Sequence, residues 1–359
     1  MNKRTDVHLK ILQPSLLPAV EVNERSDVRV SQPAMHSNHA IPTLPPIHYL
    51  RQPISHPMRS KLTLLLLLTA SVTLAQTDAK LTSQLQDAIK GFNGQAGIYV
   101  QNLKTGKTAA INADTLFPTA SMIKVSIQCG LMDKIEKGEI QYNQKLAYND
   151  SILYKGEDIL GSFKNGDTIE VSKVALLMIT MSDNTASLWL QKLVGTDYIN
   201  NWLATNGFKV MRDNSHATGR DLMHTKYGWG VTTPYEMCRL FTLISEGKAV
   251  SPAASERMVR NMGRIFWDNY ALSQIPPYIH AISKQGALNA SKSETVLVNA
   301  PHGDYVFSII TNNNQDQRWV QDNEADVLIR KISALLWHYY EPTSDWKPAE
   351  GMDKFMKDE

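Results

Sequence analysis

The chain has 359 residues, of which 43% are hydrophobic, and a formal net charge of +2 at neutral pH. This length allows one large domain or two small ones, and the apolar content is ordinary for a globular protein. Basic and acidic side chains nearly balance, and the balance turns slightly acidic once residues 1–75 are set aside. Such a chain offers no electrostatic footprint for nucleic acid.

Residues 1–57 have a composition of their own. They contain half of the prolines and half of the histidines of the chain, and neither a helical nor an alternating apolar pattern runs through them. This composition predicts a disordered N-terminal extension, or a stretch included because the start of translation was assigned too early. The histidine spacing is irregular, so we expect no metal site there.

Residues 58–75 follow the layout of a secretory signal peptide. Two basic residues close to Met58 precede the apolar run 62–68, and small residues lead to Ala75. The apolar run is too short for a comfortable membrane span. We therefore expect a secreted or periplasmic protein whose only membrane contact is this segment, with an uncleaved anchor behind a genuine extension as the alternative.

The first elements expected after the signal peptide are a hairpin and three helices. Residues 96–100 and 108–111 read as strands on either side of a glycine-containing turn. Apolar side chains over 121–135 predict a mostly buried helix. Two more apolar helices are expected over 171–181 and 185–194.

The second half of the chain adds further helices and a group of strands. Pro234 and Pro252 each stand at the first turn of an expected helix, behind a Thr or Ser cap. Strands are expected over 280–288, 294–299 and 305–311, followed by a helix over 323–340. This order predicts an α+β fold of the α/β-sandwich type, in which an antiparallel sheet from both chain ends is flanked by helices and an all-helical subdomain is inserted.

We assign residues 76–340 to this domain and residues 341–359 to a C-terminal tail. Cys129 and Cys238 both lie in apolar helical stretches, which favours two buried free thiols, although an exported protein permits a disulfide between them. No cluster of Cys and His with metal-ligand spacing occurs after the signal peptide. We expect no metal, no cofactor and a monomer.

Three short motifs carry residue types suited to acyl transfer. In the first, Ser121-Met122-Ile123-Lys124, the serine and the lysine stand three positions apart, so a helix places both on one face. A serine hydroxyl is a weak nucleophile that needs an adjacent base. A lysine that is buried can lose its proton near neutral pH and serve as that base.

The other two motifs also have simpler structural explanations. Ser182-Asp183-Asn184 lies between two apolar helices, where a Ser or an Asp is an ordinary helix cap. Lys284-Gln285-Gly286 lies on the first of the late strands, where a glycine can mark a bulge. Each motif alone is a weak signal, and their occurrence together in this order carries the functional prediction.

Together the motifs resemble the S-x-x-K, S-D-N and K-T-G set of class A β-lactamases and penicillin-binding proteins. The resemblance covers roughly residues 95–340, because the segments leading to Ser121, around Ser182 and over 231–234 are similar to those of the family. We identify the chain as a divergent member of the class A β-lactamase family, within the penicillin-recognising serine hydrolases. Gln285 departs from the Thr or Ser that is usual there.

The resemblance implies the chemistry of the first two motifs. Ser121 would attack the substrate carbonyl with Lys124 as its base, and Ser182 would pass a proton to the leaving nitrogen. The intermediate is an acyl-enzyme on Ser121. The substrate is a small molecule, either a β-lactam or a peptidoglycan stem peptide, and no nucleic acid or cofactor takes part.

The resemblance also implies how a substrate is held. Lys284 and Gln285 would bind its carboxylate, the latter with an amide in place of a hydroxyl. Gly286 would allow close approach to the strand, and the N–H of Ala287 would join that of the nucleophile in an oxyanion hole. Asn184 would hydrogen-bond the amide side chain of the substrate.

One part of the family machinery is missing. Class A enzymes release the acyl group with a water that is activated by a Glu on the Ω-loop, and here no Glu occurs between Ser182 and Glu236. By distance from Pro234, the position falls near Ala217. The side chains that could substitute are Asp213, His216, Asp221 and His224.

Three functions therefore stay open on the sequence. The first is a divergent β-lactamase that releases its product through a substitute base or through Lys124. The second is a cell-wall D-Ala-D-Ala carboxypeptidase or transpeptidase, whose acceptor is water or an amine. The third is a sensor that is acylated once, or a non-catalytic β-lactam-binding relative.

Overall fold

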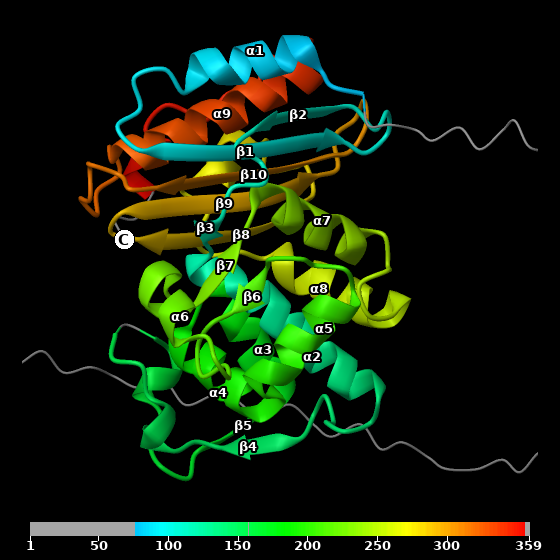
Figure 1. Cartoon of the computed structure of the whole chain (residues 1–359), viewed down its shortest axis with the longest axis vertical. Helices are drawn as coiled ribbons and strands as arrows, with labels where there is room; N and C mark the ends of the chain where they lie inside the picture. Colours follow the sequence, from blue (N-terminus) through cyan, green and yellow to red (C-terminus); the bar gives the residue numbers. More distant parts are fainter. Residues whose placement is uncertain (1–75, 157, 356–359) are drawn as a thin grey trace, which may run out of the picture. The chain divides into compact units, whose positions relative to one another are not determined.

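The computed structural model of the protein describes residues 76–156 and 158–355 (Figure 1). The expected extension and signal peptide, residues 1–75, lie outside the described residues, as does the end of the expected tail, residues 356–359. Among the helices of the described segments, none is both long and apolar enough to cross a lipid bilayer.

A five-stranded antiparallel sheet forms one part of the fold, in the order β2-β1-β10-β9-β8. Its strands are β1 (Gln95–Asn102), β2 (Thr108–Ile111), β8 (Ala281–Leu288), β9 (Ser291–Val298) and β10 (Tyr305–Asn312). Strand β1 pairs with β10, so the sheet joins both ends of the domain. The expected hairpin and the three late strands are all present, and β8 pairs with β9 in continuous register without a bulge.

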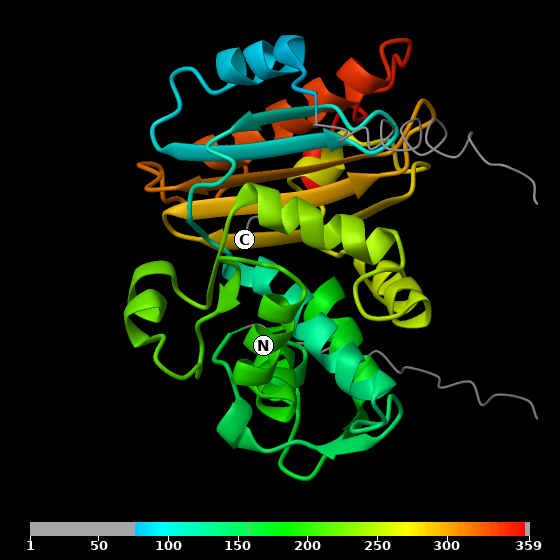
Figure 2. The same cartoon turned by 45° about the vertical axis from the view of Figure 1, so that its right-hand side comes forward.

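Helices cover both faces of this sheet (Figures 1 and 2). Helices α1 (Ala79–Ala88) and α9 (Glu324–Tyr340) pack on one face, where Leu85 and Ile329 are fully buried. Helix α7 (Pro234–Ser245) packs on the other face, against β1, β9 and β10. Thr233 caps α7 by accepting from the N–H of Glu236, as its sequence predicts.

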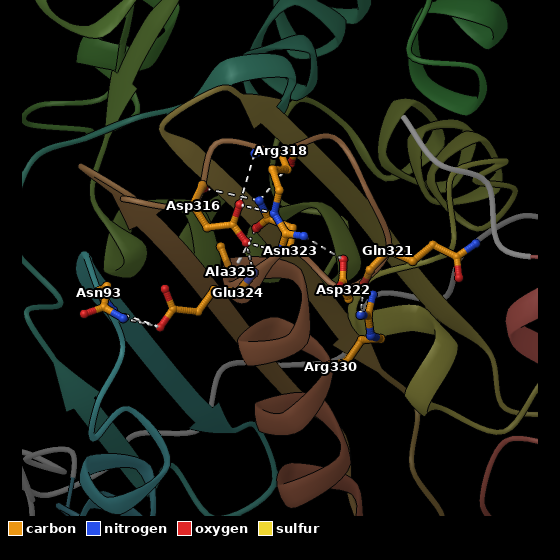
Figure 3. A network of polar contacts seen from close by, with 9 residues as sticks. All are labelled: Asn93, Asp316, Arg318, Gln321, Asp322, Asn323, Glu324, Ala325 and Arg330. Atoms are coloured by element: carbon orange, nitrogen blue, oxygen red, sulfur yellow. Dashed lines mark hydrogen bonds and ion pairs between the residues drawn. The ribbon is translucent and has the colours of Figure 1, made fainter.

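A polar network fixes the start of α9 and the loop before it (Figure 3). Asn323 caps the helix by accepting from the N–H of Ala325, and its amide donates to the carbonyl of Arg318 at 2.8 Å. The Arg318 guanidinium in turn donates to both carboxylate oxygens of Asp316 at 2.9 and 2.8 Å. Trp319, the next residue along the loop, lines the wall of a cavity described below.

The inserted part of the chain is mainly helical. Its helices are α2 (Lys124–Glu136), α3 (Val171–Thr180), α4 (Asn184–Val194), α5 (Thr196–Thr205), α6 (Asp221–Tyr227) and α8 (Pro252–Met262). Two small sheets join them, β3 (Phe117–Pro118) with β7 (Gly230–Thr232) and β6 (Arg212–Asp213), and β4 (Lys145–Ala147) with β5 (Thr168–Glu170). The α/β-sandwich with an inserted helical subdomain is confirmed.

Some elements have no counterpart in the predictions. Helices α1, α5 and α6 were not expected, and neither were the two small sheets. Strands of two or three residues are too short to show any periodicity, and α1 is polar on most of its surface, with only Leu81, Leu85 and Ala88 buried. Their positions depend on tertiary packing rather than on local pattern.

The two cysteines are buried free thiols. Cys129 lies in α2 with its sulfur 3.8 Å from that of Met258, and Cys238 lies in α7 with its sulfur 3.6 Å from the carbonyl oxygen of Tyr99. The alternative of a disulfide between them is therefore wrong. After α9, the described part of the expected tail carries one short 3₁₀ helix, Met352–Phe355, and Trp346 packs against the α1 and α9 side of the core.

Candidate active site

A cavity of about 270 Å³ opens between the edge strand β8 and the helical subdomain. All three motifs contribute to its lining: Ser121 from the first, Ser182 and Asn184 from the second, and Gln285 and Gly286 from the third. These residues lie up to about 160 positions apart in the chain. The fold thus assembles in one place what the sequence offers as three separate patterns.

Ser121 sits in a tight turn rather than at the start of an α-helix. The predicted helix 121–135 begins as a 3₁₀ helix, Ala120–Ile123, and becomes α-helical only at Lys124. In a 3₁₀ helix the side chains at i and i+3 also superimpose, and the amine of Lys124 lies 3.0 Å from the hydroxyl of Ser121. Ala120 has a φ of +43°, so the backbone before the nucleophile is strained, as is common at functional sites.

Lys124 is fully buried and bridges the first two motifs. Its Nζ lies 3.0 Å from Ser121 Oγ, 3.1 Å from Ser182 Oγ and 2.7 Å from Asn184 Oδ1, and it also donates to the carbonyl of Ser182. Burial lowers the pKa of Lys124 to about 7, although the carboxylates of Asp158 and Asp183 act in the opposite direction. A substantial fraction of this amine is therefore neutral at physiological pH and able to accept a proton.

We expect acylation of Ser121 to weaken as the pH falls through about 7. Only the neutral amine of Lys124 can take the serine proton, and burial lowers the pKa of this amine to about 7. Well below that pH, the rate should fall about tenfold per pH unit. The measurement is the rate of penicilloyl mass gain between pH 5 and pH 9, with circular dichroism at each pH to verify the fold, and a flat profile would contradict the assignment.

The Ser182 loop is braced by the carboxylate of Asp183. Its Oδ1 accepts from the N–H of Ala186 at 2.7 Å and caps α4, while its Oδ2 accepts from the N–H of Leu160 at 3.0 Å. Ser182 itself has a φ of +56°, another strained position beside the cavity. The brace keeps Ser182 and Asn184 pointed at Lys124, and its bond to Ala186 is the helix cap that the sequence predicts for this loop.

Lys284 is buried beside the same serine. Its Nζ donates to Ser182 Oγ at 3.0 Å and to the side-chain oxygen of Gln285 at 2.9 Å. The hydroxyl of Ser182 therefore lies between two lysine amines, a place suited to relaying a proton. The amide oxygen of Gln285 bonds Lys284, which leaves its NH₂ group as the part that can donate to a carboxylate.

Gly286 lies against the backbone of the turn that carries Ser121. A Cβ at this position would stand 2.5 Å from the carbonyl oxygen of Thr119 and 3.0 Å from the backbone nitrogen of Ser121. Both contacts are with backbone, which cannot rotate away. Any side chain here therefore pushes β8 away from Ser121, and Ala287 moves with the strand.

The variant Gly286→Ala is expected to lower the acylation rate by about a hundredfold, because shifts near 1 Å at a reacting centre have effects of this size. The control is Gly161→Ala, whose Cβ would meet its nearest neighbour, Leu153, at an ordinary 3.4 Å. The measurements are the acylation rate and the melting temperature of both variants. Equal rates in Gly286→Ala and the native protein would contradict the close approach.

The candidate release bases do not line the cavity. Asp213 is fully buried, accepts from Gln191 Nε2 at 2.6 Å and from the N–H of Ser215 at 3.0 Å, and its pKa is raised to about 7 by burial. His216, Asp221 and His224 are exposed on the loop and on α6. Their proposed role stays a prediction that no contact supports.

The loop that carries these residues has its own brace. Arg220 Nε donates to Asn214 Oδ1 at 2.8 Å, and Asn214 Nδ2 donates to the carbonyl of Gly228 at 3.0 Å. Gly219 and Gly228 both have positive φ, at 71° and 66°. An arginine–asparagine pair thus closes the loop, and the loop contains the short helix α6.

Several residues of the site escaped the sequence analysis, among them one carboxylate and three tryptophans. Asp158, Trp267 and Trp319 line the cavity, and the ring of Trp229 lies 5.7 Å from the amine of Lys124. Trp267 donates from its indole N–H to the carbonyl of Met181 at 2.7 Å, directly before Ser182. None of these residues belongs to a motif, so no local pattern marks them.

Comparisons with known proteins find a matching family model and a similar sequence. The model of the β-lactamase enzyme family matches residues 80–340. The chain is 25% identical over 282 residues to β-lactamase VEB-1 of Pseudomonas aeruginosa, covering 74% of this chain and 92% of the relative.

Solved structures share the fold. A point mutant of PBP-A, in an acyl-enzyme complex with penicillin G, superposes with a TM-score of 0.67 at 22% identity, over 75% of this chain and 98% of that one. A β-lactamase of Sphaerobacter thermophilus gives a TM-score of 0.65 at 21% identity, over 73% and 97% of the two chains. At these identities the superpositions show the fold alone.

Proposed function

Because the chain belongs to the β-lactamase enzyme family, we propose that it is a serine hydrolase that opens the β-lactam amide through an acyl-enzyme on Ser121. One observation carries the proposal: the buried amine of Lys124 lies 3.0 Å from Ser121 Oγ, and Ser121 lines a cavity together with residues of the other two motifs. A nucleophile with an adjacent base is the arrangement that acyl transfer needs.

The first half of the reaction follows from these contacts. Neutral Lys124 takes the proton of the Ser121 hydroxyl while the oxygen attacks the substrate carbonyl. Backbone N–H groups at Ser121 and Ala287 stabilise the oxyanion. The C–N bond then breaks, and Ser182, which bonds both Lys124 and Lys284, passes a proton to the leaving nitrogen.

The second half of the reaction is release of the acyl group from Ser121. A water must be deprotonated to attack the ester, and none of the four candidate bases between Asp213 and His224 lines the cavity. Lys124 is then the base closest to the ester, since its Nζ lies 3.0 Å from Ser121 Oγ. We therefore propose slow release, which keeps a D-Ala-D-Ala peptidase or an acylated sensor as the second candidate function.

Intact-protein mass, followed in time together with the penicillin concentration, tests the proposal. A penicilloyl mass gain that disappears as the drug is consumed supports a β-lactamase. A gain that persists for hours while the drug remains supports the peptidase or the sensor. No gain at any drug concentration contradicts the β-lactam assignment itself.

A further inference from the structure

Asp158 is a carboxylate at the wall of the cavity that no motif contains. It is half-buried and lies in the segment between β4 and β5. Its Oδ2 accepts from the N–H of Thr185 at 2.8 Å and from the hydroxyl of Thr185 at 3.1 Å. Because Thr185 follows Asn184 directly, and both Asp158 and Asn184 line the cavity, these bonds place the carboxylate on the Asn184 side of it.

The charges around the cavity have opposite signs at its two sides. Asp158 stands on the side of Asn184, where Asp183 is also close enough to interact with it. The buried carboxylate of Asp183 is held by the N–H groups of Leu160 and Ala186. On the side of β8, the buried Lys284 lies next to Gln285. The buried carboxyl of Glu294 is close enough to interact with this lysine, but burial raises its pKa to about 7, so it offsets the positive charge only in part.

Lys124 lies between these two sides. Among the described contacts it is the cation nearest to the carboxylates of Asp158 and Asp183, and burial lowers its pKa to about 7. It therefore offsets the negative charge only in part at neutral pH. The cavity is negative beside Asn184 and positive beside Gln285. A ligand that matches both sides is zwitterionic, with an ammonium and a carboxylate on opposite sides of the reacting amide.

We propose that Asp158 is a specificity-determining residue that selects acyl donors carrying a protonated amino group on the acyl side of the scissile amide. The inference rests on the proposed function, in which Asn184 binds the carbonyl of the acyl side chain. An amino group on the carbon next to that carbonyl then reaches toward Asp158. Penicillins with an α-amino group and peptide stems with a free amino group both belong to this class.

Three penicillins that share one skeleton provide the test. Penicillin G carries hydrogen at the α-carbon of its phenylacetyl group, ampicillin carries an ammonium there, and carbenicillin carries a carboxylate. Their second-order acylation constants are measured on the full protein, at a pH at which titration of ampicillin shows its amine protonated. Ratios to penicillin G at that same pH cancel the titration of Lys124.

The native protein is expected to favour ampicillin over penicillin G about fivefold and to disfavour carbenicillin by a similar factor, the size of a partly exposed charge interaction. The variant Asp158→Asn keeps the shape of the side chain and removes its charge. Both ratios should then move toward one. High salt should move the ratios of the native protein in the same direction, because screening weakens exposed charge pairs.

Asp87→Asn is the matched control, since this aspartate is exposed on α1 and does not line the cavity. Its ratios should equal those of the native protein. Unchanged ratios in Asp158→Asn, or an equal loss with all three penicillins, would overturn the inference and leave the proposed function standing. If none of the three acylates the native protein, the proposed function fails instead.

Discussion

Replacement of Ser121 by alanine is expected to abolish covalent labelling by penicillin. The variant keeps the cavity and both buried lysines but lacks the oxygen that forms the ester. The acylation rate should fall by at least about 1000-fold, to the background of the assay. Intact-protein mass after incubation with excess penicillin measures this directly.

Ser126→Ala is the control for that experiment. Ser126 lies on α2, just beyond the motif lysine, and its buried hydroxyl donates to the carbonyl of Ile123 at 2.6 Å. This variant removes a nearby serine hydroxyl that does not line the cavity. Labelling should persist in this control, and labelling that also persists in Ser121→Ala would mean that another group is the nucleophile.

Replacement of Lys124 by methionine is expected to slow acylation by about 100- to 10,000-fold, the contribution typical of a positioned general base. Methionine fills much of the same buried volume and has no proton-accepting amine. The rate that remains should no longer fall with pH as the native rate does, because the amine that must be neutral to accept the serine proton is absent.

Lys134→Met provides the comparison on the same helix. Lys134 also lies on α2, but its amine pairs with Glu139 at 3.5 Å near the surface. This variant should acylate at the native rate. Melting temperatures of both variants show whether the loss in Lys124→Met comes from chemistry, and a native acylation rate in Lys124→Met would rule that amine out as the base.

The sequence predicts the parts of the site that depend on local geometry. Ser121 and Lys124 could be paired because three residues make about one helical turn, whether that turn is α or 3₁₀. Asp183 could be recognised as a candidate helix cap because a residue that caps a helix bonds only a few positions ahead. The helix expected from Ser121 is present, and its first turn is 3₁₀.

Residues that reach the site across long distances could not be predicted in the same way. Asp158, Trp267 and Trp319 each come from a connection between regular elements, and their places depend on how those connections pack. Trp319 is held by the indole bond to Asn289 and by the amine of Lys292 at 3.6 Å from its ring. No periodicity in the sequence marks such contacts.

The position of the release base could not be found by counting residues along the loop. The expected position near Ala217 was found by distance from Pro234, but two glycines with positive φ and the helix α6 change the path of the chain between them. Asp213 is turned into the core and bonds Gln191. The domain boundaries and the export signal over residues 58–75 stay predictions.

The identity of the acylated serine is the most direct test of this account, because Lys124 lies 3.0 Å from Ser121 Oγ and 3.1 Å from Ser182 Oγ. The protein is quenched at the peak of the mass gain and digested, and the penicilloyl group is mapped by peptide mass spectrometry. We predict the adduct on the peptide that contains Ser121. An adduct on Ser182 would contradict the assignment of nucleophile and relay.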